Sequence, residues 1–225
     1  MIAVIGAMQV EVDAIKQKMD SIQEEQIHGL SITKGSINDT DIVLALSGVG
    51  KVNAAMTVSI LCCEFDITMI INIGTAGGMR KDQHTLDIVV ADEIIQYDFD
   101  TSPIDGDSGL GIYAHCDNAL TQLASICLKS DEYRVWRGDI ASGDKFVAKD
   151  ELIDSIINQY PSVMACDMES GSIAQVANHL NVKCVAIRSL SDIAHHEKSE
   201  MDFATYAAKA SERSAEFVEA FIKTL

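Results

Sequence analysis

The sequence predicts a layered α/β fold in a single domain, residues 1–225, with helices on both faces of a central sheet. Short apolar runs, typical of buried strands, alternate with segments of helical periodicity along the whole chain. The length of 225 residues fits one large domain, and no linker or repeat interrupts it. The composition, 48% apolar and 23% charged, is that of a globular protein and excludes a disordered chain.

The predicted strands are apolar runs that end at glycine or at polar residues. Residues 2–5 end at Gly6, and residues 69–73 end at the glycine-rich stretch 74–78. A turn at Asn38 and Asp39 separates two further strands. In chain order, the predicted strands are 2–5, 30–33, 41–46, 69–73, 87–91 continuing through 93–96, 136–141, 163–167 and 182–190.

The predicted helices repeat apolar residues at intervals of three and four between these strands. The first carries them at positions 10, 12, 15 and 19, and the last begins at Phe203. Residues 97–111 are polar and glycine-rich, which predicts a long loop, and long loops are often functional. In chain order, the predicted helices are 10–19, 51–63, 118–129, 150–158, 171–179 and 203–225.

The charge of the chain argues against two classes of partner. With 34 acidic and 17 basic residues, the formal net charge is −17. Such a surface repels nucleic-acid phosphates and anionic membranes. No apolar run approaches the ~18–20 residues of a membrane-spanning helix, and the apolar N-terminus lacks the basic start of a signal peptide. We therefore expect neither a nucleic-acid nor a membrane partner.

The six cysteines are expected to be reduced thiols in the core of the protein. None form a C-x-x-C pair, and no histidine lies at zinc-finger spacing from them. A chain of this length forms a sufficient core without disulfides. This pattern predicts a cytoplasmic protein.

Two short motifs are weak matches to ligand sites. Gly50 and Lys51 resemble a phosphate-binding loop, but Ala45 replaces its first glycine and Val52 replaces its magnesium-binding hydroxyl. The run 195–197, His-His-Glu, lacks the second histidine of a helical zinc motif. These two motifs therefore predict neither a phosphate-binding loop nor a zinc site.

Polar and small residues gather at the predicted strand ends, where ligands bind in α/β folds. Each has an ordinary structural explanation, such as capping a helix or stabilising its dipole. Their joint placement at one edge of the sheet favours a binding site. They are Glu11, the stretch Thr75-Ala76-Gly77-Gly78, Asp167-Met168-Glu169, Arg188 and Ser191-Asp192.

These residues lie in motifs by which the whole chain resembles the 5′-methylthioadenosine/S-adenosylhomocysteine nucleosidases of the purine nucleoside phosphorylase-like superfamily. Each matching motif is short, but their number, order and spacing are specific. Leu86 departs from the pattern, since the family usually has glycine there, and predicts a different turn. The motifs are IGAMQVE (5–11), SGVGKV (47–52), INIGTAGG (71–78), DIVV (87–90), SGDKFV (142–147), DME (167–169) and RSLSD (188–192).

The resemblance implies a three-layer αβα sandwich around a mixed, twisted sheet, and hydrolysis of an adenosyl N-glycosidic bond. Asp192, oriented by Ser191, would protonate the leaving adenine at N7. Glu11 would activate the attacking water, which Arg188 and Thr75 would help to hold. The remaining catalytic carboxylate, Glu169, would bind the ribose hydroxyls and stabilise the cationic sugar.

The resemblance also implies a set of substrate contacts, a homodimer, and a reaction that needs no metal and no organic cofactor. Phe146 would stack on the base and the Val147 backbone would read its edge, while Met168 would pack on the ribose. Met8 and Phe203 would line the pocket for the 5′ group, and Thr101 and Ile104 would reach the site of the neighbouring subunit. Ala76, Gly77 and Asp167, which replaces a frequent glutamate, complete the set.

Two other functions stay open at this point. A purine nucleoside phosphorylase needs several cationic groups for phosphate, yet no arginine or lysine precedes Lys16 near Gly6, and Glu11 would repel phosphate. A non-catalytic nucleoside-binding protein would be expected to lose Glu11 or Asp192. The resemblance implies an adenine nucleoside as substrate, and 5′-deoxyadenosine and 6-amino-6-deoxyfutalosine remain open beside 5′-methylthioadenosine and S-adenosylhomocysteine.

Overall fold

The structure of the protein is a computed structural model that describes residues 1–128, 132–194 and 199–225, the side chains of 199–205 excepted. Its strands are β1 (Ile2–Gly6), β2 (Asp20–Ile27), β3 (Leu30–Ile37), β4 (Thr40–Leu46), β5 (Met69–Gly78), β6 (Ile88–Asp100), β7 (Leu110–His115), β8 (Val135–Ser142), β9 (Val163–Asp167) and β10 (Lys183–Ile193). Its helices are α1 (Gln9–Lys16), α2 (Lys51–Glu64), α3 (Ser102–Asp105), α4 (Asn118–Cys127), α5 (Asp150–Gln159), α6 (Ser170–His179) and α7 (Ser199–Ile222), with a 3₁₀ turn, η1 (Gly106–Gly109).

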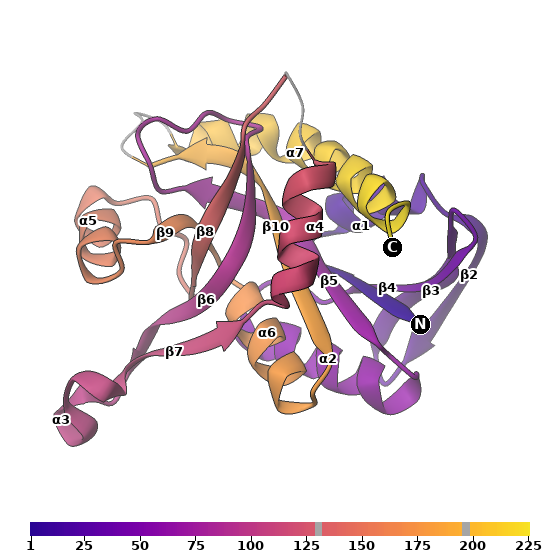
Figure 1. Cartoon of the computed structure of the whole chain (residues 1–225), viewed down its shortest axis with the longest axis horizontal. Helices are drawn as coiled ribbons and strands as arrows, with labels where there is room; N and C mark the ends of the chain where they lie inside the picture. The colour runs from indigo at the N-terminus through magenta and orange to yellow at the C-terminus, as the bar shows by residue number, and fades with distance from the viewer. Residues whose placement is uncertain (129–131, 195–198) are drawn as a thin grey trace.

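Within the described residues the strands form one mixed sheet that closes on itself at one end (Figure 1). The open end runs β2-β3-β4-β1-β5. From β5 the sheet continues in both directions, because β5 pairs with β10 on one side and β9 on the other. The strands β10, β6, β8 and β9 complete the ring, and β7 pairs with β6 outside it. The predicted α/β class is confirmed, whereas the ring had no counterpart in the sequence pattern.

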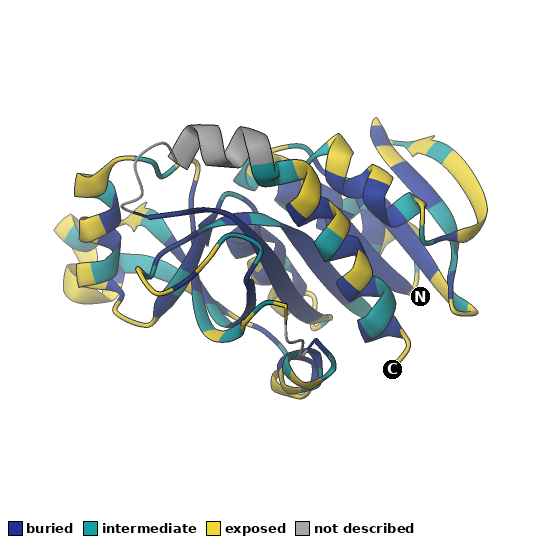
Figure 2. Cartoon of the chain, turned by 90° about the horizontal axis from the view of Figure 1, so that it is seen from above, coloured by how far each residue is buried: buried dark blue, intermediate teal, exposed yellow. Residues whose placement is uncertain are grey.

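Helices cover both faces of the sheet, as predicted. Neighbouring residues of a buried strand point to opposite faces, so Ala3 and Ile5 pack toward α2 and α6. Val4 instead packs with the helices of the other face, α1, α4 and α7. Figure 2 shows the result: strands that are mostly buried lie beneath helices whose outer sides are exposed. None of the described helices has both the length and the apolar composition needed to span a membrane.

The strands extend further than the apolar runs predicted. Residues 74–78 continue β5, and Ser191 and Asp192 continue β10, so these residues are paired strand residues and not loops. The prediction of strand ends at residues 73 and 190 was therefore wrong. Small and polar residues are accommodated here because they face a cavity instead of the apolar core.

The prediction of a long loop over residues 97–111 was largely wrong. Strand β6 runs through to Asp100, and β7, which no pattern indicated, starts at Leu110. Between them α3 and η1 form the tip of an arm, residues 97–113, that projects from the body of the molecule (Figure 1). The strand β2 was also missed, because its mostly exposed, polar residues show no apolar alternation.

The turn at Leu86 keeps the conformation that glycine favours. The φ angle of Leu86 is +70°, in the left-handed region. Its N–H donates to the carbonyl of Leu190 at 2.7 Å, which holds the turn against β10. The leucine side chain is therefore accommodated in a left-handed turn at the cost of backbone strain, and the expectation that this turn differs from that of the family stays a prediction.

Candidate active site

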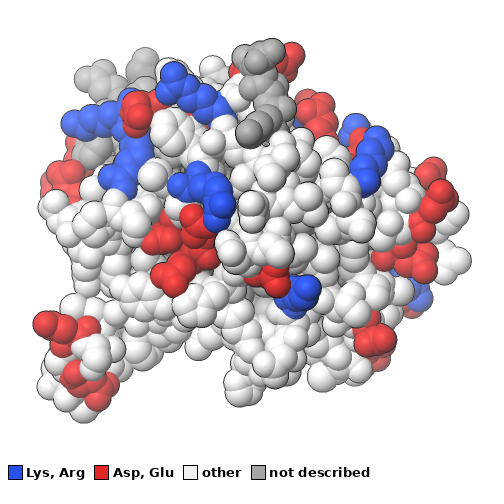
Figure 3. Space-filling view, viewed as in Figure 1, with Lys and Arg blue, Asp and Glu red and all other residues white. Residues whose placement is uncertain are grey.

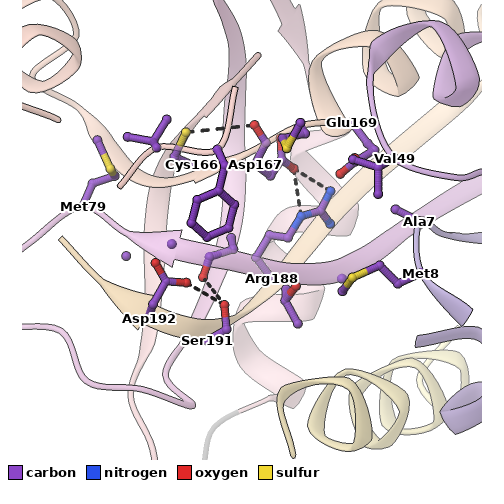
Figure 4. A pocket seen from close by; sticks show the side chains of 18 of the residues that line it. Ala7, Met8, Val49, Met79, Cys166, Asp167, Glu169, Arg188, Ser191 and Asp192 are labelled. Atoms are coloured by element: carbon purple, nitrogen blue, oxygen red, sulfur yellow. Dashed lines mark hydrogen bonds and ion pairs between the residues drawn. The ribbon is translucent and has the colours of Figure 1, made fainter. Parts of the chain in front are cut away.

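A cavity of about 290 Å³ lies where β1, β5, β9 and β10 end (Figure 4). Thirteen of the predicted site residues line it, drawn from separate parts of the chain. The parallel pairing of β1, β5 and β10 brings their carboxyl ends to one edge, as the sequence analysis assumed. The thirteen are Met8, Glu11, Thr75, Ala76, Gly77, Phe146, Val147, Asp167, Met168, Glu169, Arg188, Ser191 and Asp192.

Glu11 is buried in the first turn of α1, and its carboxylate is held by backbone groups. Oε2 accepts hydrogen bonds from the N–H groups of Ala7 at 2.8 Å and Met8 at 3.0 Å. Oε1 accepts from the N–H of Thr75 at 2.9 Å and lies 3.5 Å from its hydroxyl. Gly74 gives the carboxylate room, since a Cβ there would lie 2.9 Å from Oε1. Burial raises the pKa of Glu11, while these N–H groups and the charge of Arg188 oppose the rise.

Arg188 is the largest fully buried side chain, and it is held by an ion pair and by Asn72. Its Nε donates to Asp167 Oδ2 at 2.8 Å, and Nη2 lies 2.6 Å from the same oxygen. Nη1 donates to the carbonyls of Asn72 and Ile187, and Nη2 donates to Asn72 Oδ1. These five contacts match the five N–H donors of a guanidinium. Arg188 therefore acts on the cavity mainly through its charge.

Asp167 belongs to this framework more than to the open cavity. One oxygen is taken by Arg188, and the other accepts from the N–H of Ser170 at 3.3 Å, at the start of α6. Asn72 holds the other side of the guanidinium, and its own Nδ2 donates to the carbonyl of Ile5 at 3.2 Å. No sequence pattern indicated a role for Asn72, although it lies in the matched motif over residues 71–78.

Glu169 follows β9 and points into the cavity from the start of α6 (Figure 4). Its Oε1 accepts from the N–H of Gly50 at 2.9 Å. Burial raises the pKa of Glu169 to about 7, and the charges of Asp167 and Glu11 add to the rise. The Gly50 N–H and the charge of Arg188 act in the opposite direction. Near neutral pH this carboxyl is therefore poised between its two protonation states.

The Ser191-Asp192 pair reaches the cavity through an irregularity in β10. The register with β5 shifts between Leu190 and Asp192, which redirects neighbouring side chains. The Ser191 hydroxyl donates to Asp192 Oδ1 at 2.7 Å and lies 3.4 Å from the Ala76 carbonyl. A Cβ on Gly77 would lie 3.2 Å from Asp192 Oδ2, so glycine leaves this carboxylate space. Figure 4 shows the two side chains together beneath Arg188.

The N-terminus of α2 explains the weak resemblance to a phosphate loop. Helix N-termini bind anions through free N–H groups. Here the N–H of Gly50 binds Glu169, and that of Lys51 donates to Asp144 Oδ1 at 2.8 Å. The chain's own carboxylates therefore occupy the groups that would otherwise hold a phosphate.

Two predicted site residues, Thr101 and Ile104, do not line the cavity of this chain. Thr101 and Ile104 lie on the arm, where Ile104 is 86% exposed. The side chain of Phe203 lies outside the described residues, as does the run 195–197. Lining residues that sequence reasoning missed include Val49 and Lys145, which lie within matched motifs, and Cys166, which precedes Asp167. Met79, Ile153 and Ala194 also line the cavity, and no motif indicated them.

The six cysteines are free thiols, as predicted. Cys116, Cys166 and Cys184 are buried, whereas Cys63 is exposed, so the expectation that all are core residues was wrong. Among the residues that the structure describes, no three histidine, cysteine or acidic side chains gather as a metal site.

The chain is similar to known proteins over its whole length. A family model described as the phosphorylase superfamily matches residues 1–223. The chain is 36% identical over 228 aligned residues to the 5′-methylthioadenosine/S-adenosylhomocysteine nucleosidase of Oceanobacillus iheyensis, which covers 100% of this chain and 99% of that protein.

Two solved structures are similar over their whole length. The nucleosidase of the same name from Neisseria meningitidis, in complex with methylthio-immucillin-A, has a TM-score of 0.94 at 32% identity, covering 100% of this chain and 99% of that one. Futalosine hydrolase of Helicobacter pylori has a TM-score of 0.92 at 28% identity, covering 100% and 97%. The chain belongs to the phosphorylase superfamily and, within it, to the 5′-methylthioadenosine/S-adenosylhomocysteine nucleosidase family.

Proposed function

We propose that the protein hydrolyses the N-glycosidic bond of 5′-methylthioadenosine and S-adenosylhomocysteine, releasing adenine and a 5-thioribose. The observation that carries this proposal is the meeting of Glu11, Glu169 and Asp192 in one cavity. The names of the similar proteins support the same reaction class. Similarity to a futalosine hydrolase keeps 6-amino-6-deoxyfutalosine open as a substrate, together with 5′-deoxyadenosine.

Asp192 is the acid in this proposal. As the bond between N9 and C1′ breaks, its electron pair moves onto adenine, and Asp192 gives a proton to N7. The hydrogen bond from the Ser191 hydroxyl to Oδ1 fixes the orientation of the carboxyl group. The stacking of adenine on Phe146 and a contact with the Val147 backbone would hold the base, and both residues line the cavity.

Glu11 is the base that takes a proton from water as the water oxygen attacks C1′. Burial raises the pKa of Glu11 and so makes the carboxylate a better proton acceptor. The Thr75 hydroxyl, 3.5 Å from Oε1, is placed to orient that water. Arg188 would contribute its charge, since protein acceptors already take its N–H groups.

Glu169 would bind the ribose hydroxyls, and its ionised form would stabilise the positive charge that develops on the sugar. Met168 would pack on the ribose, and Met8 would line the pocket for the 5′ group, together with Phe203. Met8 and Met168 both line the cavity.

The contacts of Arg188 favour hydrolysis over phosphorolysis. A phosphate dianion needs cationic donors with free N–H groups. The five guanidinium donors of Arg188 are matched by protein acceptors, and the N–H groups of Gly50 and Lys51 hold Glu169 and Asp144. A phosphate in the cavity would also face the carboxylates of Glu11 and Glu169.

We further propose a cytoplasmic homodimer in which residues 1–225 act as one nucleosidase domain. The arm carries exposed apolar side chains, Phe99, Ile104 and Tyr113, that one chain leaves uncovered. Val52 and Met56 on the nearby helix α2 are exposed as well. Figure 3 shows acidic groups on the arm, so it would dock through its apolar residues and keep its carboxylates at the rim.

The deciding experiment is adenine release from 5′-methylthioadenosine by the purified protein, in phosphate-free buffer and again with added phosphate. Equal release in both buffers supports hydrolysis. Release only with phosphate would overturn the role of Glu11 and favour a phosphorylase. Absence of release from each of the four candidate nucleosides would favour a binding protein.

A further inference from the structure

Three charged residues from separate segments form a closed set of contacts beside the cavity. Lys51 Nζ lies 2.6 Å from Asp98 Oδ1, and the Asp144 N–H donates to Asp98 Oδ2 at 2.9 Å. The N–H of Lys51 donates back to Asp144 Oδ1 at 2.8 Å. We name this set of Lys51, Asp98 and Asp144 the clasp. It joins the start of α2, the base of the arm and the loop between β8 and α5.

The clasp is more sheltered than a typical surface ion pair. The side chains of Lys51 and Asp98 are 20% and 13% exposed, whereas Glu24 in the pair with Lys16 is 64% exposed. Burial alone would raise the pKa of Asp98, but the hydrogen bonds from Lys51 and Asp144 outweigh it and hold that pKa below its usual value. A sheltered, doubly bonded pair restricts its segments more than an exposed pair does.

Two of the three segments joined by the clasp, the start of α2 and the loop between β8 and α5, border the cavity. Gly50, next to Lys51, donates the hydrogen bond that Glu169 accepts. Lys145, Phe146 and Val147, next to Asp144, line the cavity themselves. The clasp therefore touches no substrate position, but it adjoins both the support of Glu169 and the proposed base-stacking loop.

The fit between these segments is close, which limits alternative arrangements. A Cβ on Gly143 would lie 2.6 Å from Tyr97 Cε1 and 3.0 Å from Asp98 Cγ. Gly50 has a φ of +97°, and a Cβ there would lie 3.2 Å from Asp144 Oδ1. Loss of the contact between the Lys51 side chain and Asp98 would remove the ion pair that holds the start of α2 against the base of the arm.

We propose that Lys51 and Asp98 are positioning residues for the nucleosidase reaction, because their ion pair fixes the Gly50 N–H against Glu169 and fixes the loop that carries Phe146. This inference rests on the proposed function through the role given to Glu169. The charged groups that face Glu169 are Asp167, Glu11 and Arg188, and the clasp changes none of them directly.

The test compares Lys51→Met and Asp98→Asn with the wild-type protein and with two controls. Lys51→Arg keeps the ion pair, and Lys16→Met removes an equal charge from the exposed pair with Glu24. We expect Lys51→Met and Asp98→Asn to lower kcat/KM for 5′-methylthioadenosine about tenfold or more, since small misplacements near a reacting centre are costly. Lys51→Arg should recover most of the loss, and Lys16→Met should show none.

A pH profile separates positioning from a general loss of stability. The Gly50 N–H favours the ionised form of Glu169, so a displaced Gly50 should move the acid limb of kcat/KM to higher pH. An unchanged profile and unchanged kcat/KM in both variants would overturn the proposal, as would a loss of thermal stability with kinetics like those of the wild type.

Hydrogen exchange keeps the clasp testable apart from the activity. Amides of residues 49–51 and 144–147 should exchange faster in Lys51→Met than in the wild type or Lys16→Met. If the wild type releases no adenine, the proposed function fails, and this exchange difference still decides whether the clasp holds Gly50. Equal exchange in all proteins would show that it does not.

Discussion

Asp192 and Glu11 are both buried carboxylates, yet their partners differ in a way that separates their proposed roles. Backbone N–H groups surround Glu11 and favour its ionised form, as a base requires. The Asp192 carboxylate accepts a hydrogen bond from the Ser191 hydroxyl, and Gly77 leaves it space beside β5. The two carboxyl groups therefore lie in different surroundings, which fits their proposed roles as acid and base.

Replacing Asp192 with asparagine should lower the rate of adenine release by about 10²-fold or more, because the amide cannot supply a proton to N7. The amide oxygen can still accept the Ser191 hydrogen bond, so the fold should persist. Single-turnover kinetics at saturating substrate measure the rate of adenine release, and thermal unfolding measures whether the fold persists. Turnover close to that of the wild type would contradict the assignment.

Replacing Glu169 with glutamine should change how stability depends on pH. Its pKa is raised to about 7 from 4.5, so the folded protein holds this proton more tightly than the unfolded chain. The wild type therefore loses stability as pH rises from about 4.5 to 7, and the variant does not. At pH 8 the free energy of unfolding of the variant should therefore exceed that of the wild type by up to about 3 kcal/mol.

Denaturant titrations at pH 4 and pH 8 check this prediction, with Glu216→Gln as an exposed control. If the two proteins differ in free energy of unfolding by the same amount at both pH values, folding does not raise the pKa of Glu169. Activity should fall in the same variant, since the neutral amide stabilises a cationic sugar less well.

At the scale of single elements, the turn before β6 carries strain that one substitution can relieve. Leu86 has a φ of +70°, which costs a non-glycine residue energy. Leu86→Gly should raise the free energy of unfolding by about 1 kcal/mol, because the relief outweighs the loss of a partly buried side chain. The melting temperature should rise by about 2–4 °C.

Leu180→Gly is the matched control for that turn. Leu180 has a φ of −87° and is 43% exposed, so glycine gains nothing there and should lower stability. Stabilisation of both variants, or of neither, would show that the backbone angle of Leu86 is not the source of the effect.

The sequence predicted most elements because their apolar residues face a core. It missed β2 and β7, which lie at edges of the sheet and have no continuous apolar face. It also ended β5 and β10 too early, because polarity there reflects the cavity and not a loop. Apolar patterning reports burial in the core, and it is silent where a strand faces solvent or a ligand.

The same limit applies to the candidate site. Glu11, Arg188 and Asp192 could be predicted because motifs mark them, and the structure brings them together. The role of Asn72 and the N–H of Gly50 could not be predicted, since each depends on a partner more than 100 residues away. Contacts over such separations follow from the order of the strands in the sheet, and the apolar pattern of the sequence does not indicate that order.

At the scale of the whole molecule, the arm carries apolar side chains that a single chain leaves exposed. Ile104→Asp should weaken self-association, because a charge on an apolar contact must be desolvated on docking. Sedimentation velocity should show a shift toward monomer, and KM for 5′-methylthioadenosine should rise. Ile126→Asp, on exposed Ile126 of α4, is the control. Association equal to that of the wild type would contradict the role proposed for the arm.

The open end of the sheet has a consequence for how the protein behaves when it is crowded. A terminal strand offers unpaired backbone groups on which another chain can grow, and this is a route to aggregation. On β2 the carboxylates of Glu24 and Glu25 are paired with Lys16 and Lys34, and Asp20 is exposed. A second chain would have to desolvate these charges and would gain little apolar contact in return. The polar residues that leave β2 without an apolar pattern in the sequence therefore protect this edge strand from pairing with another chain. They also favour solubility at high concentration.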